Sequence, residues 1–242
     1  MSQASRRNEL DQAEGTVLLP LFPLRLVLFP GQVLPLHIFE PRYRMMVNQC
    51  VDENQPFGVV LMRDDTPDWR MYSGDVALPH DVGTTAHIRR VERLPDGRLN
   101  IVTVGLHRFR VRELRFDKPY LQGMVEGFPL AESGSADILR QAIAVRRLLH
   151  DYVQQLSQII DTEIGVDDLP DDPRALAFVT GSALQLPWND KQGLLDTPDL
   201  NGLLATERQL LSREQAMLNF MRRTEARLNE QVTGPTGYIY PN

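Results

Sequence analysis

The sequence is poor in residues on which several kinds of chemistry depend. It has one cysteine, Cys50, so it cannot form an intramolecular disulfide or a zinc site built on paired cysteines. Its only lysines are Lys118 and Lys191, and each follows an aspartate. A phosphate-binding P-loop needs Gly-Lys followed by Ser or Thr, so no such loop is present. The Gly-x-Ser-x-Gly motif of serine hydrolases is absent as well, and the sequence therefore predicts no enzyme of these classes.

Long apolar runs are also missing. A membrane-spanning helix needs ~20 unbroken apolar residues, and the most apolar stretch, residues 19–44, is interrupted by Pro20, Pro23, Pro30 and Pro35 before a fifth proline at residue 41. The first fifteen residues, MSQASRRNELDQAEG, are polar and lack the apolar centre of a signal peptide. Together with the single cysteine, these features indicate a cytoplasmic protein that does not enter membranes. The net charge of −6 gives no general attraction to nucleic acid or to anionic lipid.

Metal ligands do not cluster along the chain. None of the five histidines belongs to a His-x-x-x-His pair or lies near the cysteine. The acidic segment 161–172 lacks the ordered ligands, central glycine and terminal glutamate of a calcium loop. We therefore expect no metal and no cofactor.

The stretch 19–44 reads LPLFPLRLVLFPGQVLPLHIFEPRYR. Each proline removes a backbone donor and fixes φ, which excludes a helix. We expect two strands, Val17–Phe22 and Val33–Phe39, joined by a bend at Phe29-Pro30-Gly31.

Further strand patterns continue to about residue 130. They are Phe57–Met62, Gly83–Leu94, Leu99–Leu106, Phe109–Phe116 and Tyr120–Phe128. About seven strands within ~115 residues, without crossover helices, predict a small antiparallel barrel over residues 1–130.

The spacing of apolar residues along the chain changes after residue 131. Apolar residues spaced by four and three from Ile138 to Ile159 predict an amphipathic helix. A second helix should begin at Asp172-Pro173, with the aspartate as its cap. Two more are expected at Asn189–Leu195 and from Thr197 to about Glu230. The sequence thus predicts an α+β fold whose second part, residues 131–242, is a small helical bundle with one long C-terminal helix.

Two segments carry a family resemblance. The first contains PLFPL, LFPG and LPLHIFEPRYR between Pro20 and Arg44, and it resembles the opening signature of the Lon protease N-terminal domain. The second, GTTAHIRRVERLPDGRLNIVTVGLHRFRV at 83–111, is similar to the same family. The resemblance covers roughly residues 17–213. It implies a PUA-like pseudobarrel in a stand-alone bacterial member without ATPase or protease domains, which binds polypeptide substrates or a protein partner without catalysis.

The bend in the first segment is a candidate peptide-binding surface. It has more apolar residues than a short strand pair can bury, namely Leu24, Leu26, Val27, Phe29 and Pro30. If the bend is exposed, it forms an apolar patch of the kind that binds proteins, beside a strand edge that could accept a peptide. Core packing is the alternative.

A polar group follows the bend. It consists of His37, Glu40, Arg42 and Tyr43. Polar residues embedded in apolar sequence are usually paired, so we expect a structural salt bridge.

Arginines concentrate between residues 83 and 115. Eight arginines against three acidic residues leave this segment at +5, and Arg89, Arg108, Arg110 and Arg112 define a basic face. RNA binding through this face is the alternative function. It is disfavoured because the segment has one aromatic residue, Phe109, whose position in the alternation points inward. The sequence is also compatible with a weak homo-oligomer of this chain.

Overall fold

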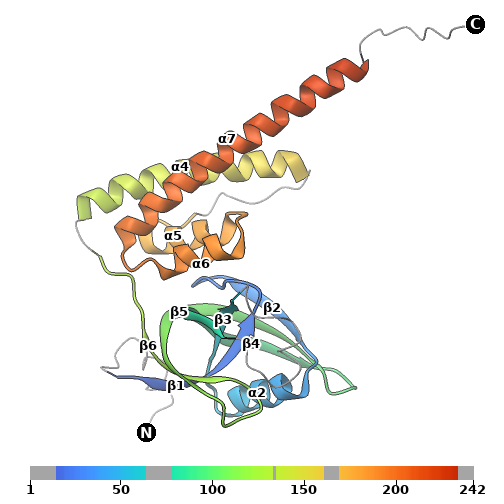
Figure 1. Ribbon diagram of the computed structural model, residues 1–242, viewed down its shortest axis with the longest axis vertical. Helices are drawn as coiled ribbons and strands as arrows, with labels where there is room; N and C mark the ends of the chain where they lie inside the picture. Colours follow the sequence, from blue (N-terminus) through green and yellow to red (C-terminus); the bar gives the residue numbers. More distant parts are fainter. Residues whose placement is uncertain (1–14, 64–77, 133–134, 161–168, 234–242) are drawn as a thin grey trace, which may run out of the picture.

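The computed structural model describes residues 15–63, 78–132, 135–160 and 169–233. A β part comes first and a helical part second, and the two are stacked along the long axis of the molecule (Figure 1). The α+β class predicted from the sequence is confirmed. Within the described residues, no helix is both long and apolar enough to cross a membrane.

Six strands form the described sheet. They are β1 (Val17–Leu24), β2 (Val33–Ile38), β3 (Phe57–Met62), β4 (Pro79–Arg93), β5 (Leu99–Arg115) and β6 (Gln122–Gly127). Their order is β2-β5-β4-β3-β1-β6, and an additional pairing between β5 and β6 closes the barrel. The prediction of a wholly antiparallel barrel is wrong in one place, because β1 and β3 are parallel. Parallel neighbours need a long connection, and β2 with the following helix provides it.

Strand β5 joins two of the expected strands into one of 17 residues. Its first half pairs with β2 and β4, and its second half pairs with β6. Register shifts lie between Thr84 and Ala86 and between Val111 and Glu113. Such bulges bend a strand and increase its twist, so one strand can follow the barrel around.

Helix α2 (Pro41–Asp52) closes the lower end of the barrel (Figure 1). Proline at its first turn suits the helix start, where no backbone donor is needed. Its buried side includes Cys50, which packs in a cluster with Phe22, Ile38 and Phe57. Burial raises the pKa of the Cys50 thiol to about 12, so this cysteine acts as a small apolar residue.

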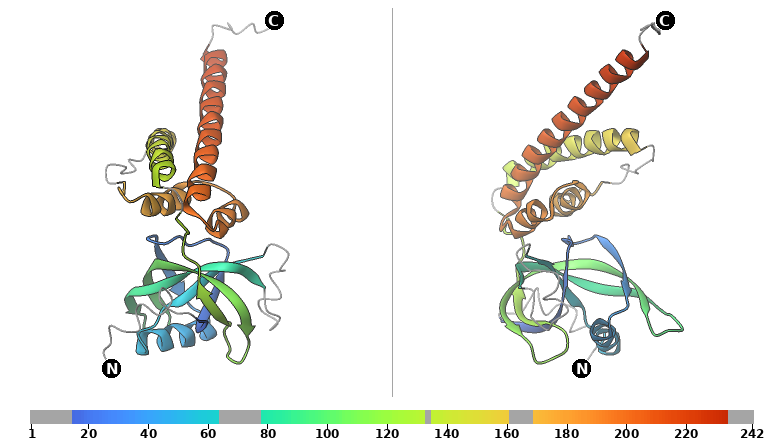
Figure 2. Two further views of the ribbon diagram at one scale, coloured as in Figure 1. Left: turned by 90° about the vertical axis from the view of Figure 1, so that its left-hand side faces the viewer. Right: turned by 45° about the vertical axis from the view of Figure 1, so that its right-hand side comes forward.

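The helical part consists of α4 (Ser135–Ile160), α5 (Pro173–Ala183), α6 (Trp188–Asp196) and α7 (Leu200–Thr233). Asp172 caps α5 as predicted, by accepting a hydrogen bond of 2.8 Å from the Ala175 amide. Helix α7 begins later than expected, because Asp199 caps it through the Gly202 amide. With 34 residues it spans roughly 50 Å, and its second half extends beyond α4 (Figures 1 and 2).

Candidate functional site

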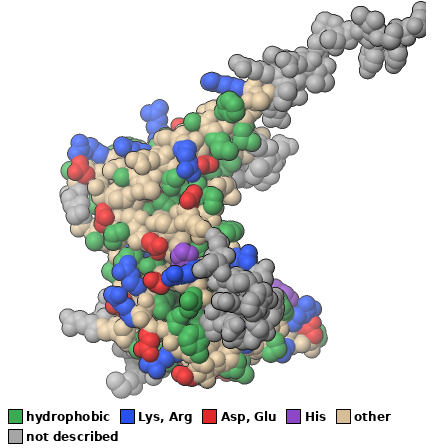
Figure 3. Space-filling view, in the orientation of Figure 1, with side chains coloured by type: hydrophobic (Ala, Val, Ile, Leu, Met, Phe, Trp, Pro, Cys, Tyr) green, Lys and Arg blue, Asp and Glu red, His purple; other side chains and the backbone are tan. Residues whose placement is uncertain are grey.

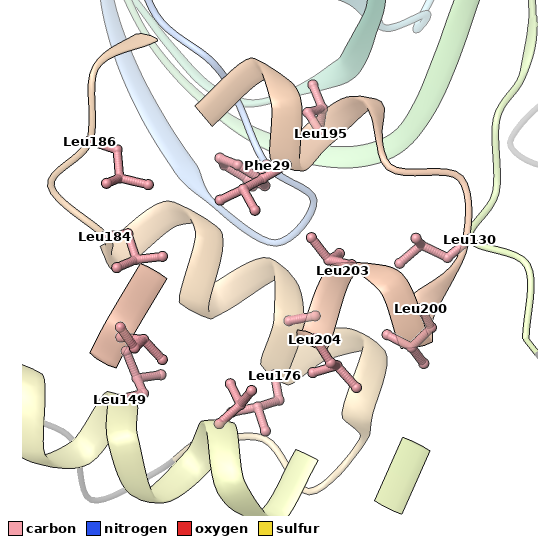
Figure 4. Close-up of a cluster of buried hydrophobic side chains, with 14 of the residues drawn as sticks. Phe29, Leu130, Leu149, Leu176, Leu184, Leu186, Leu195, Leu200, Leu203 and Leu204 are labelled. Carbon is pink, nitrogen blue, oxygen red and sulfur yellow. The ribbon is translucent and has the colours of Figure 1, made fainter. Parts of the chain in front are cut away.

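The bend between β1 and β2 lies against the helical part. Val27, Leu28 and Phe29 have exposed fractions of 5%, 1% and 1%, so the exposure on which the peptide-binding hypothesis depends is absent at Val27 and Phe29. Phe29 belongs to the same buried cluster as the leucines of α4, α5 and α7 (Figure 4). A Cβ atom at Gly181 of α5 would lie 2.6 Å from the Phe29 ring. The core-packing alternative therefore describes the centre of the bend.

The ends of the bend are more accessible. Leu24, Leu26 and Pro30 are partly exposed, and Arg25 between the leucines is exposed. Leu24 and Leu26 also pack against the buried cluster under α2. What the bend leaves at the surface is therefore a set of separate, half-covered side chains.

Arg108 is also buried at the junction of the two parts. Its Nη1 donates hydrogen bonds of 2.6 Å to the Leu195 carbonyl and 2.7 Å to the Thr197 carbonyl, at the end of α6. Its guanidinium lies over the Phe128 ring, 4.6 Å from the centroid. The expectation of a solvated basic face is wrong for Arg108, because its side chain is buried and bonded to the end of α6. Burial lowers the pKa of Arg108 to about 10, which leaves the side chain charged at neutral pH.

The other arginines of the expected basic face have different surroundings. Arg110 is partly buried with its guanidinium 4.1 Å from the Phe128 centroid, and Arg112 forms an ion pair with Glu126. Arg89 is exposed on β4. The four arginines therefore do not act as one free cationic surface.

Polar groups from both parts meet at the rim of the junction. Figure 3 shows acidic, basic and histidine side chains gathered there. Gln192 of α6 donates hydrogen bonds to the Val82 carbonyl of β4 (3.0 Å) and to Asp196 (2.7 Å). Burial raises the pKa of Asp196, while this hydrogen bond and the charges of His80 and Arg110 act in the opposite direction. These contacts join the two parts.

The four residues of the predicted polar group lie at two separate positions in the structure. Glu40 and Arg42 form an ion pair of 2.8 Å, and Arg42 lies over the Tyr43 ring. His37 lies apart from them. Its Nδ1 is 2.7 Å from Asn100 Oδ1, and its Nε2 is 3.3 Å from Nη1 of Arg98. Since the amide oxygen can only accept and the guanidinium can only donate, this arrangement suits an imidazole that donates from Nδ1 to Asn100.

The outer face of β2 and β5 is apolar next to this histidine. Val33 is 58% exposed and pairs with Val104, and the exposed Pro35 pairs with Val102. Both partner valines are half-buried. Phe39, just after β2, is 60% exposed and stacks beside the His37 ring. We call the following set the β2 edge surface: Val33, Pro35, His37, Phe39, Val102 and Val104.

Strand β2 is the end strand of the described sheet, and it can be followed in Figure 2 between the bend and α2. The Gln32 carbonyl accepts a hydrogen bond from the Gly105 amide, so residue 32 faces β5. Because peptide groups alternate in an antiparallel pair, those of Val33, Pro35 and His37 face away from β5. Among the described residues they have no strand partner. The free edge thus offers three carbonyls and two amide donors, since proline has no N–H.

Only His37 of this surface was selected from the sequence. The alternation of VLPLHIF indicates the other outward-facing side chains of β2, because every second residue from Val33 is on the outer side. The position of β2 at the end of the sheet was not available, because strand order is a property of the whole fold. Among the described residues, no group of three or more His, Cys, Asp or Glu side chains could hold a metal ion.

Comparisons with known proteins agree with the sequence resemblance. The family model described as the ATP-dependent protease La (LON) substrate-binding domain matches residues 18–213. Lon protease 2 of Myxococcus xanthus is 25% identical over 220 residues, which are 89% of this chain and 26% of that protein. The chain spans about a quarter of the length of the curated relatives it matches.

Two solved structures share the fold. A Lon N-terminal domain protein from Xanthomonas campestris is 26% identical, with a TM-score of 0.57 over 81% of this chain and 98% of that one. The N-terminal domain of the Mycobacterium avium complex Lon protease gives a TM-score of 0.62 at 23% identity, again over 81% of this chain and 98% of that one.

Proposed function

Because the chain belongs to the family of the ATP-dependent protease La (LON) substrate-binding domain, we propose that it recognises extended polypeptide segments at the β2 edge surface. The observation that carries the proposal is the edge of β2, whose outward peptide groups have no strand partner among the described residues and lie beside exposed apolar side chains. Main-chain hydrogen bonds provide affinity for any extended chain, and flanking side chains provide selectivity.

The geometry favours unfolded substrates. A strand in a folded protein has its peptide groups paired already, whereas an unfolded segment can donate to and accept from a free edge. An added strand would place alternate side chains beside Val33 and Pro35 on the outer face. Its other side chains would lie beside Leu34 and Leu36, which are partly buried on the barrel side. A short segment that is apolar on both faces should therefore bind best.

Pro35 restricts the register of the added strand. A substrate carbonyl placed opposite Pro35 has no amide donor there, and an unpaired carbonyl at an interface is costly. The two remaining donors, the amides of Val33 and His37, lie on either side of it. We expect the substrate to bind in a register that leaves its least buried carbonyl at this position.

Replacing Val33 with glutamate tests the surface. A charge on an edge strand disfavours strand addition, and Val33 is exposed enough that folding should be unaffected. We expect affinity for reduced, carboxymethylated α-lactalbumin, measured by fluorescence anisotropy, to fall tenfold or more with an unchanged melting temperature.

The matched control is Ile143→Glu on α4, where an isoleucine 71% exposed gains the same charge in the helical part. This variant should bind like the wild type. Equal affinity of the Val33 variant and the wild type, or equal weakening by both changes, would place the binding surface elsewhere.

The purified chain should neither hydrolyse ATP nor cleave casein. It lacks the Gly-Lys-Ser/Thr loop that holds ATP phosphates, and neither lysine lies in a sequence resembling the serine–lysine site of Lon peptidases. Phosphate release and fluorescent casein assays would check this. An activity that persists through further purification and disappears with a point change in this chain would contradict the prediction.

A further inference from the structure

Glu207 is a carboxyl group buried without a partner in the helical part. Its exposed fraction is 0%, and neither Oε1 nor Oε2 has a hydrogen-bond partner among the described residues. It lies on the side of α7 that also carries Leu203, Leu204 and Leu211, all of them fully buried in the main cluster. An acidic residue in this position is rare, because burying a carboxylate without compensation costs far more than burying a neutral acid.

The helices packed on α7 provide no charge to balance it. Helices α4, α5 and α6 all contact α7. The buried side of α4 carries no charged group. Its polar members are Tyr152, whose hydroxyl accepts a hydrogen bond from the Gln185 amide, and Gln141 and Gln155, whose Oε1 atoms are buried. The buried side of α5 carries no titratable group.

The charged residues of these helices are engaged or exposed elsewhere. Arg146 of α4 donates to the Leu169 carbonyl, and Arg174 of α5 pairs with Glu132. Lys191 of α6 donates to the Ser182 carbonyl. His150 pairs with Asp151 on α4, Arg213 pairs with Glu214 on α7, and Arg208 is exposed. Burial is accordingly the one cause that raises the pKa of Glu207 well above its ordinary value.

We propose that Glu207 is a proton-controlled latch: the protonated side chain lets α7 dock on α4 and α5, and its ionisation releases α7 from them. The neutral acid fits among leucines, whereas the anion must reach water, which requires the helices to separate. Helix α7 begins directly after Asp199, which forms an isolated backbone β-bridge with Ala131. Release of α7 from α4 and α5 would therefore also change how its projecting half is held relative to the β part (Figure 1).

The direction of the pH dependence follows from proton linkage. Below the unfolded-state pKa of ~4.3, both states hold the proton, and Glu207 does not make stability depend on pH. Above it the unfolded chain loses the proton while the folded chain keeps it. Stability then falls as pH rises, by up to about tenfold in the unfolding equilibrium constant per pH unit, until the folded-state pKa is passed.

The test compares the wild type with Glu207→Gln, a neutral side chain of the same shape. Urea unfolding from pH 5 to pH 9 should show the wild type losing stability relative to the variant, with a slope approaching one proton. Hydrogen exchange followed by mass spectrometry should show amides of α4 and α7 opening faster in the wild type than in the variant at the alkaline end. The β strands should exchange alike in both proteins, because the helices packed on α7 are α4, α5 and α6.

Two results would overturn the proposal. One is the same pH slope in both proteins, and the other is failure of both Glu207→Gln and the apolar Glu207→Met to fold at any pH. The second result would mean that the carboxyl group itself bonds something essential to the fold.

Discussion

Replacing Phe29 with alanine is expected to lower the free energy of unfolding by about 3–5 kcal/mol. The ring is 1% exposed and fills the space between the bend and α5, so its removal leaves a cavity that rigid neighbours cannot close. It is also a side chain of the β part that packs in the core of the helical part (Figure 4). Urea unfolding followed by circular dichroism would measure the loss.

A second substitution identifies the contact. In the wild type, Gly181→Ala forces a methyl group to within 2.6 Å of the Phe29 ring and should destabilise the protein. In the Phe29→Ala background the ring is absent, and the same change should stabilise the protein, because alanine favours a helix by about 1 kcal/mol over glycine. A change of sign between the two backgrounds shows direct packing. A small loss of stability in Phe29→Ala, together with weaker polypeptide binding, would instead restore the bend as the docking surface.

The sequence predicts which side of each strand is buried better than it predicts what covers the other side. On β5, alternation correctly placed Phe109 inward, where it is 0% exposed. The same alternation placed Arg108 on the outside of the barrel, which is correct. The side chain is nevertheless buried, because the end of α6, a helix that contacts the neighbouring strand β4, accepts its hydrogen bond. The packing partner comes from residues almost ninety positions later, and a local pattern contains no information about it.

The β2 edge surface could not be predicted from a local sequence pattern either, because it depends on the order of the strands in the sheet. The apolar and proline pattern of Val33–Ile38 was enough to predict a strand, and proline in a strand favours an edge. Which edge stays free depends on the parallel pairing of β1 with β3, since this pairing puts β1 and β3 in the middle of the sheet and leaves β2 at its end. The family resemblance predicts the general fold, whereas the free edge follows only from the order of the strands in three dimensions.

Replacing Arg108 with methionine should lower the free energy of unfolding by about 2–4 kcal/mol, because the buried Leu195 carbonyl and the partly buried Thr197 carbonyl would lose their donor. Methionine retains the length and much of the volume of the side chain, so packing against Phe128 and Phe178 changes little. The carbonyls of Leu195 and Thr197 lie where α6 ends, and without Arg108 this end should detach from β5 first. Urea unfolding followed by the fluorescence of Trp188, in a Trp69→Phe background that removes the second tryptophan, should therefore start at lower urea than unfolding followed by β-sheet circular dichroism.

The control is Arg112→Met on the same strand, where the side chain is exposed and its pairing with Glu126 is open to solvent. Ion pairs of this kind contribute little, so its unfolding midpoint should stay at the wild-type value. The comparison also distinguishes a structural role of the arginines on β5 from a role in nucleic-acid binding. Nucleic-acid binding would depend on exposed Arg112 and not on Arg108. An Arg108→Met protein as stable as the wild type would show that dehydrating the guanidinium costs as much as its bonds return. The two parts would then be held together chiefly by Phe29 and its apolar neighbours.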